Sequence, residues 1–367
     1  MLSYRERILT IINHDEADRV AYQVSYVPEV NDLLKKKYIK KISEFKNENT
    51  VYDESIILDE ILGHDMLFLN HGICLGYYKN SSSDKYVDKW NIEWKKTYYD
   101  TINGKGYYTE IVKSPLAEDS LVDSYLPPDP FKEDLSHTER IIKKYSSKYF
   151  LVANVGSSVF EGLRYLRGFT QSMIDLIACK DIARRVMDVT VDYHIKLGIR
   201  LINLGIDMLY LADDYAAQNC LLMSEDTFRE MCKPKMAYMI QEFKKANKDI
   251  KIAFHSCGNV RSILDDIIET GVDVLNPVQP EAVNPAELKK RYGKKLVLWG
   301  GLSNQKTMPN GKPDDIKKEM KNLISNCAPG GGFILSPAHN VQLDAPIANI
   351  EAFYECINDC GRYPLNI

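Results

Sequence analysis

The chain of 367 residues carries 47 Lys and Arg against 51 Asp and Glu, and its formal net charge of −4 argues against a nucleic acid as its main partner. No stretch approaches the roughly 20 apolar residues of a membrane span, and the charged start, Met1 to Arg7, lacks the apolar stretch of a signal peptide. The eight cysteines are scattered without a C-x-x-C pair, so we expect a cytoplasmic protein with reduced thiols that binds neither nucleic acid nor membrane.

Short apolar runs alternate with amphipathic helical patterns along the chain. The candidate strands are residues 20–24, 65–69, 150–155, 207–212, 252–254, 272–275, 296–299 and 332–335. Helical patterns lie at residues 181–204, 225–245, 260–270, 285–292, 314–325 and 347–358. This repetition predicts parallel strands with right-handed crossovers, which close into a (β/α)₈ TIM barrel of the α/β class. An open doubly wound sheet is the alternative, but no Gly-rich phosphate loop follows an early strand.

The segment 78–125 interrupts this rhythm. Residues 86–94 and 106–112 alternate as extended strands do, and Asn103-Gly104 between them is a turn signal. We expect an inserted antiparallel β-hairpin that covers one end of the barrel. Because the insertion is short, we treat residues 1–367 as a single domain.

Polar residues follow the predicted strands, which is where a (β/α)₈ barrel carries its catalytic groups. They include Ser157, Ser158, Asp213, Asp214, Gln218, His255, Cys257, Asn276, Gln279 and His339. The pair His255 and Cys257 stands out, because positions i and i+2 of a strand end point the same way. Imidazole and thiolate are ligands that zinc prefers, and His339, Asp213 or Asp214 is available as a third ligand from another strand.

Other interpretations of these residues stay open. His255 and Cys257 can be a hydrogen-bonded structural histidine and a buried thiol, or a nucleophile pair, although no orienting base or oxyanion hole is evident. Asp213 and Asp214 are adjacent, so at most one is expected in the mouth, and either can form a salt bridge or cap a helix. Glu60 lies in a helical stretch flanked by apolar residues, where its carboxylate faces either the cavity or solvent.

Several of these segments resemble the uroporphyrinogen decarboxylase superfamily, which also contains cobalamin-dependent methyltransferases. The similarity is carried by residues 213–218, the H-x-C-G turn 255–258, and residues 273–279, 299–301 and 330–353. Decarboxylases of this superfamily carry an arginine-rich segment after the first strand, which binds the carboxylates of the porphyrinogen. Residues 22–29 of this chain hold no arginine. The chain therefore resembles more closely the methyltransferase branch, typified by methylcobalamin:coenzyme M methyltransferases.

The resemblance implies a zinc-dependent enzyme that transfers a methyl group between a small donor or thiol acceptor and a corrinoid. Zinc would be held by His255, Cys257 and His339, the last standing where the branch has a cysteine. Asp213 or Asp214 would orient a ligand or the substrate, and the pocket would be lined by Tyr26, Gln218, Asn276 and Gln279. A separate corrinoid protein would dock at the barrel mouth, because the chain shows no cobalamin-binding module. Since members of the superfamily often dimerise, a homodimer is also expected.

Two rival functions remain at this point. One is a metal-independent decarboxylase of a less anionic substrate, with Glu60, Asp213 or Asp214 as its acid. The other is a non-catalytic protein that keeps the barrel as a docking surface for a corrinoid partner.

Overall fold

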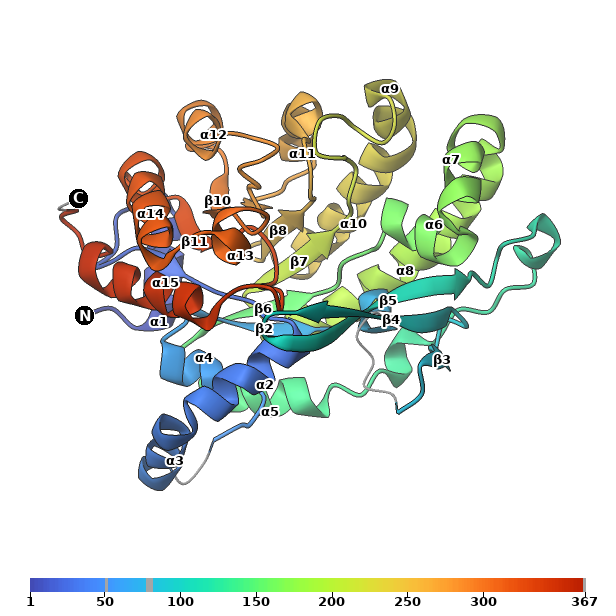
Figure 1. Ribbon diagram of the computed structural model, residues 1–367. Helices are drawn as coiled ribbons and strands as arrows, with labels where there is room; N and C mark the ends of the chain where they lie inside the picture. The colour runs from blue at the N-terminus through green and yellow to red at the C-terminus, as the bar shows by residue number, and fades with distance from the viewer. Residues whose placement is uncertain (50–51, 77–81, 366–367) are drawn as a thin grey trace.

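Eight parallel strands form the central sheet of the computed structural model, which describes residues 1–49, 52–76 and 82–365 (Figure 1). They lie in the order β1, β11, β10, β9, β8, β7, β6, β2. Their bounds are β1 Ala21–Tyr22, β2 Met66–Asn70, β6 Phe150–Asn154, β7 Met208–Ala212, β8 Lys251–His255, β9 Val274–Asn276, β10 Val297–Leu302 and β11 Phe333–Pro337. The predicted (β/α)₈ barrel is confirmed.

The two strands at the ends of this order, β1 and β2, meet at Asp65. The Asp65 N–H donates to the carbonyl oxygen of Tyr22 at 3.1 Å, and the Tyr22 N–H donates to the Asp65 carboxylate at 2.9 Å. The same carboxylate is fully buried and accepts hydrogen bonds from Arg7 at 2.6 Å and Arg19 at 2.7 Å. A buried carboxylate is tolerated only where it is paired and hydrogen-bonded, so this cluster joins the two strands and nearly closes the barrel.

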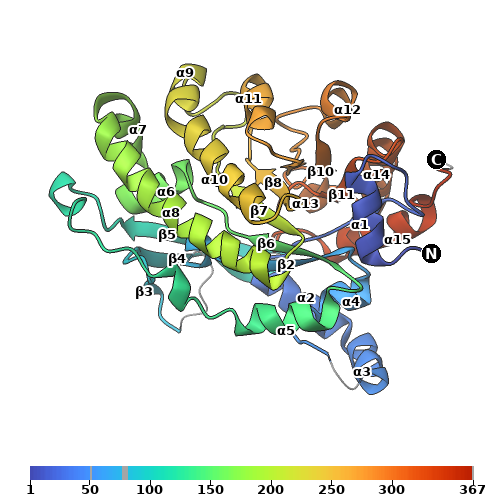
Figure 2. The same ribbon diagram turned by 180° about the vertical axis from the view of Figure 1, so that it is seen from behind.

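Helices cover the outside of the sheet (Figures 1 and 2). Those that follow or precede strands are α2 Pro28–Lys37, α3 Ile39–Glu48, α4 Ile57–Leu62, α5 Ser136–Tyr145, α6 Phe160–Arg167, α7 Phe169–Ala178, α8 Lys180–Leu204, α10 Lys233–Ala246, α11 Leu264–Glu269, α12 Pro285–Tyr292, α14 Pro313–Cys327 and α15 Ile347–Cys360. Within the described ranges, none is long and apolar enough to cross a bilayer.

Alternating side chains separate the barrel interior from the layer under the helices. Val152 and Met208 pack inside the barrel, together with Ile8 and Ile11 of α1 (Tyr4–Ile12), which covers the amino-terminal end of the strands (Figure 2). Ala253 of β8 belongs to the same interior cluster. Because side chains alternate along a strand, His255, two residues further on, also faces inward, at the carboxyl end of the barrel.

The insertion forms a three-stranded antiparallel sheet of β3 (Lys85–Val87), β4 (Glu93–Thr101) and β5 (Gly104–Lys113). The predicted hairpin is present as β4 and β5. The strand expected over residues 86–94 is instead broken, because the Asp88 carboxylate accepts the N–H groups of Trp90 and Ile92 and turns the chain. Residues 77–81, the start of the predicted insertion, lie outside the described part of the chain.

The inserted sheet lies beside the mouth of the barrel. The side-chain amide of Asn103 donates to the carbonyl oxygens of Leu343 and Ala345 at 2.8 and 2.9 Å, in the loop that follows β11. The N–H of Tyr107 donates to Glu29, on the segment that follows β1, at 3.2 Å. The sheet therefore borders the end of the barrel at which polar residues follow the strands.

Candidate metal centre at the barrel mouth

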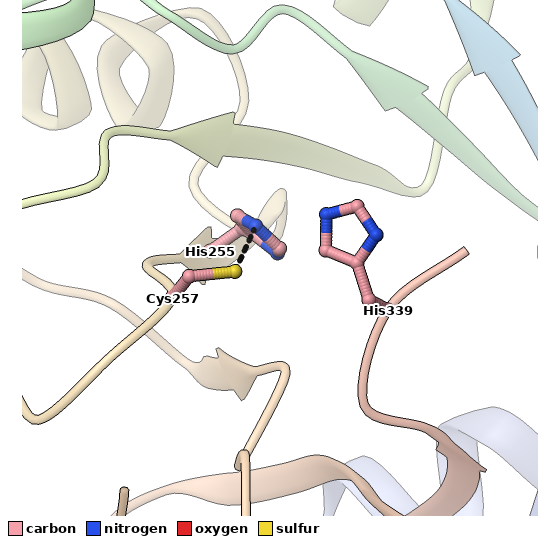
Figure 3. Close-up of side chains that lie close together, drawn as sticks. All are labelled: His255, Cys257 and His339. Atoms are coloured by element: carbon pink, nitrogen blue, oxygen red, sulfur yellow. Dashed lines mark hydrogen bonds between the residues drawn. The ribbon is translucent and has the colours of Figure 1, made fainter. Parts of the chain in front are cut away.

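Three potential metal ligands meet at the mouth. His255 ends β8, Cys257 lies two residues further in the following turn, and His339 faces them from the loop after β11 (Figure 3). Their donor atoms all lie within 4.8 Å of one another, and the Cys257 Sγ is 3.5 Å from the His255 Nε2. A tetrahedral zinc ion with ordinary bond lengths separates such donors by about 3.6 Å. The His255–Cys257 pair therefore already has ligand spacing, and the distances from His339 to these two donors exceed it by at most about 1.4 Å.

The turn that carries Cys257 is held from both neighbouring strands. The Cys257 N–H donates to the Asp214 Oδ1 at 2.8 Å, and the Gly258 N–H donates to the Gln279 Oε1 at 3.1 Å. Gly258 has φ +85°, and a Cβ there would lie 2.5–2.6 Å from the carbonyl oxygens of Ala217 and Ala216. Only glycine fits this position without strain, which explains the glycine of the H-x-C-G turn.

The ring of His255 is oriented by Asn276. The Asn276 side-chain amide donates through Nδ2 to the carbonyl oxygen of Trp299 at 3.1 Å, so that its Oδ1 faces the His255 Nδ1 at 2.6 Å. The Tyr210 hydroxyl donates to the same Oδ1 at 2.7 Å and also lies 2.6 Å from the His255 Nδ1. Because Oδ1 can only accept, the proton of the neutral ring sits on Nδ1. The Nε2 lone pair is then directed at the site, which is the tautomer a metal ligand needs.

The surroundings favour uncharged forms of the other two donors. Burial raises the pKa of the Cys257 thiol well above its usual range, and the carboxylates of Asp214 and Glu161 raise it further. Desolvation of the ring, followed by the neighbouring His255 ring, lowers the pKa of His339 to about 4, so its ring is neutral at pH 7. A cation at the site would reverse the effect on the thiol, since a coordinating thiol loses its proton.

The adjacent aspartates after β7 have different roles. Asp213 is 2% exposed, and its carboxylate accepts the N–H groups of Val159 and Glu161 at 3.1 and 2.7 Å, at the start of α6. Asp213 thus caps α6. Burial raises the pKa of the Asp213 carboxylate, and the charge of Glu161 raises it further. Asp214 turns the other way and lies 3.8 Å from the His255 Nε2.

Glu60 does not join this cluster. Its carboxylate accepts the Tyr145 hydroxyl at 3.1 Å and lies 3.9 Å from the Lys148 Nζ. Both residues precede β6, so Glu60 lies at the amino-terminal end of the strands, opposite the three potential ligands. The helix that carries Glu60 runs into β2 and is therefore placed at that end by the topology of the barrel.

The predicted pocket-lining residues separate into two groups. Asn276 and Gln279 contact the H-x-C-G turn, as described above. Tyr26 instead bonds through its hydroxyl to that of Tyr354 on α15, which also contacts His64 at 2.7 Å. Gln218 is exposed in the turn between the bridged residues Ala216 and Leu221. Tyr26 and Gln218 are therefore not brought to the three potential ligands.

A charged pair that was not predicted from the sequence lies beside Cys257. The Glu161 carboxylate accepts the Ser157 hydroxyl and the Arg164 guanidinium, both at 2.7 Å. Burial, followed by the charge of Asp214, raises the pKa of Glu161 to about 7. The spacing of Glu161 and Arg164 on the helix after a predicted strand was the available signal, since such i,i+3 pairs share a helix face.

Comparisons with known proteins agree with this architecture. The family model described as "Uroporphyrinogen decarboxylase (URO-D)" matches residues 104–360. The methylcobamide:CoM methyltransferase MtaA of Methanosarcina barkeri is 29% identical over 172 residues, which are 47% of each chain, so the match spans about half of that relative. The uroporphyrinogen decarboxylase of Vibrio vulnificus strain YJ016 is 27% identical over 100 residues, 27% of each chain. A solved methyltransferase from Methanosarcina mazei has the same fold, with a TM-score of 0.71, 18% identity, and coverage of 98% of this chain and 99% of its own.

Proposed function

Because the chain belongs to the uroporphyrinogen decarboxylase family, we propose that it is a zinc-dependent methyltransferase that works with a corrinoid. The observation that carries this proposal is the meeting of His255, Cys257 and His339 at the barrel mouth. The longer of the matches to curated proteins are to methylcobamide:CoM methyltransferases, which supports this branch of the family. A methyl group would pass between a small donor or thiol and a corrinoid carried by a partner protein.

The residues at the mouth fit a zinc ion. His255 presents the Nε2 lone pair, Cys257 lies at ligand spacing from it, and His339 completes a donor set of two imidazoles and one thiolate. When bound, zinc supplies Lewis-acid activation of the thiol or heteroatom of the substrate. Asn276 holds the ring of His255 in the required tautomer, and Gln279 holds the turn.

The decarboxylase alternative has less support from the site. Glu60 lies at the opposite end of the strands, and the Asp213 carboxylate is committed to the start of α6. Asp214 would then be the remaining acid of those predicted. The region after β1 also offers no arginine among residues 22–29 for a polyanionic substrate.

Elemental analysis of the purified protein tests the proposal. We expect about one zinc ion per chain, lost in Cys257→Ser and in His339→Ala, because a structural or catalytic zinc needs at least three protein ligands. Cys220→Ser is the matched control, since Cys220 is an exposed cysteine outside the cluster, and it should keep its zinc. A second assay follows the demethylation of methylcobalamin by its absorbance, in the presence of a simple thiol. Wild-type protein that takes up no zinc from a supplemented medium would refute the proposal.

A further inference from the structure

A polar cavity lies apart from the three potential metal ligands, none of which is among the described residues that line it. It has a volume of about 340 Å³ and is bordered by α11, the end of α12 and the segment that joins β7 to α9 (Glu225–Thr227) (Figure 1). Small-molecule sites have volumes of about 300–1,000 Å³, so this cavity is large enough for a small organic ligand. Asn259, which lines it, directly follows the H-x-C-G turn.

Two guanidinium groups line this cavity. Arg261 lies in the 3₁₀ turn Arg261–Ile263 before α11, and Arg291 lies near the end of α12. Arg261 is exposed, and its guanidinium has no hydrogen bond or ion pair among the described residues. The Arg291 Nη2 lies 3.3 Å from the Asp265 Oδ2, and both side chains are more than half exposed. Because such an exposed pair is weak, Arg291 is available to a stronger anion.

Uncharged donors lie beside these guanidinium groups. They are the side-chain amides of Asn219 and Asn259 and the hydroxyl of Ser262. The Oδ1 of Asn259 accepts the N–H of Arg261 at 3.2 Å, so its Nδ2 remains as a donor. Asp265 is the one acidic residue among the described residues of the lining, and two arginines face it. The lining therefore has a net positive charge and more donors than acceptors.

Of the common biological anions, a phosphate ester matches this lining best. A guanidinium group offers two parallel N–H donors, which fit the oxygens of a phosphate. A phosphate monoester has three terminal oxygens and a charge of about −1.5 to −2 at pH 7, which two arginines can share. A carboxylate has only two oxygens and one charge. The cavity is also larger than a phosphate group alone needs, which leaves room for an organic body beside Asn219 and Asn259.

We propose that this cavity binds a small organic molecule through its phosphate ester, held between Arg261 and Arg291. Binding involves hydrogen bonds and ion pairs alone, without a covalent step. It also requires no metal, so that a metal-free preparation should bind the ligand as well as the zinc protein does. The proposal is thus independent of the proposed methyl transfer, and either can fail without the other.

Isothermal titration calorimetry with adenosine monophosphate as the probe tests the proposal, in a phosphate-free buffer at low salt, since salt screens exposed charges. We expect a dissociation constant below about 1 mM. Adenosine, which lacks the phosphate, should bind at least about tenfold more weakly. Arg261→Gln should lower the affinity for adenosine monophosphate at least about tenfold, because it removes a charged donor. Asp265→Asn should raise this affinity, since it releases Arg291 and removes a negative charge.

The matched control is Arg140→Gln. Arg140 lies on α5 and is also exposed, without an ion pair among the described residues, and it does not line the cavity. The control variant should bind adenosine monophosphate as the wild type does. Equal affinities of Arg261→Gln and wild type for this probe would overturn the proposal, as would equal affinities of the wild type for adenosine monophosphate and adenosine.

Alkylation of Cys220 locates the bound probe in the wild-type protein, so this measurement needs no variant to fold. Cys220 is exposed and lines the cavity. At about five times the dissociation constant, adenosine monophosphate should slow the reaction of Cys220 with iodoacetamide about fivefold, as measured by mass spectrometry of peptides. Cys179 and Cys360, which are partly exposed and do not line the cavity, should react at unchanged rates. Binding without protection of Cys220 would place the probe elsewhere and overturn the assignment.

Discussion

The orientation of His255 by Asn276 predicts a measurable loss of metal affinity in Asn276→Leu. This substitution removes the Oδ1 that accepts the His255 Nδ1–H at 2.6 Å and the Tyr210 hydroxyl at 2.7 Å, and it leaves that hydroxyl, which also lies 2.6 Å from Nδ1, free to donate to the ring. Each net hydrogen bond is worth about 1 kcal/mol, so the two together contribute about 2 kcal/mol to the ring orientation. Because about 1.4 kcal/mol corresponds to a factor of ten, zinc affinity should fall about 30-fold. This lies within the range of about 10–100-fold measured for partners of metal-ligating histidines.

Competition for zinc against a chromophoric chelator at neutral pH measures this effect. Asn276→Asp retains an acceptor for the His255 Nδ1–H and should keep most of the affinity. Tyr210→Phe removes one of the two hydrogen bonds and should lose only about fivefold. Circular dichroism checks that each variant is folded, since Asn276 also donates to the carbonyl oxygen of Trp299. Equal zinc affinities of Asn276→Leu and wild type would show that the ring of His255 does not depend on Asn276.

Two further predictions concern stability. Asp65→Asn should lower the free energy of unfolding by about 3–5 kcal/mol, since it leaves Arg7 and Arg19 without their buried partner. Urea unfolding measures it, with the exposed pair Asp265–Arg291 as control, where Asp265→Asn should change little. The pKa of Glu161 is raised from the ordinary 4.5 to about 7. Between these two pH values the folded chain keeps a proton that the unfolded chain has lost. Its contribution to the free energy of unfolding therefore falls as pH rises through that window, by up to about 3 kcal/mol. Glu161→Gln should remove this slope in urea unfolding between about pH 5 and pH 8, and an unchanged slope would contradict the assignment.

The strands of the barrel were predictable because their apolar runs are short and bounded by turn residues. The inserted hairpin was also visible, since its two strands flank Asn103-Gly104. The break in the predicted strand near Trp90 could not be predicted from the sequence. It depends on the Asp88 carboxylate, which accepts the backbone N–H groups of Trp90 and Ile92. Local hydrogen bonds of this kind compete with extended structure, but alternation of side chains along a sequence does not report them.

The meeting of the three potential ligands was predictable in part. His255 and Cys257 are two residues apart on one strand tip, so their proximity follows from the period of a strand. The proximity of His339 required the strand order of the barrel, which places the loop after β11 across the mouth from β8. Glu60 was misplaced because a helix that precedes a strand ends at the amino-terminal side of the sheet. Glu161 was missed because it lies within the following helix, beyond the residues that directly follow β6.

The support of the centre is unevenly distributed among its three donors. His255 is fixed by Asn276, and Cys257 by the Asp214 carboxylate, so both depend on the register of β8 against β7 and β9. His339 is exposed, and its ring meets the ring of His255 edge to face with centroids 6.0 Å apart, without a side-chain hydrogen bond among the described residues. Two donors are thus preorganised, while the third can adjust its position by the small distance that separates it from tetrahedral geometry. Since preorganisation reduces the cost of binding, most of the metal affinity should depend on the hydrogen bonds around β8. Apart from His339 itself, the residues of the loop after β11 can then vary with a smaller effect on that affinity.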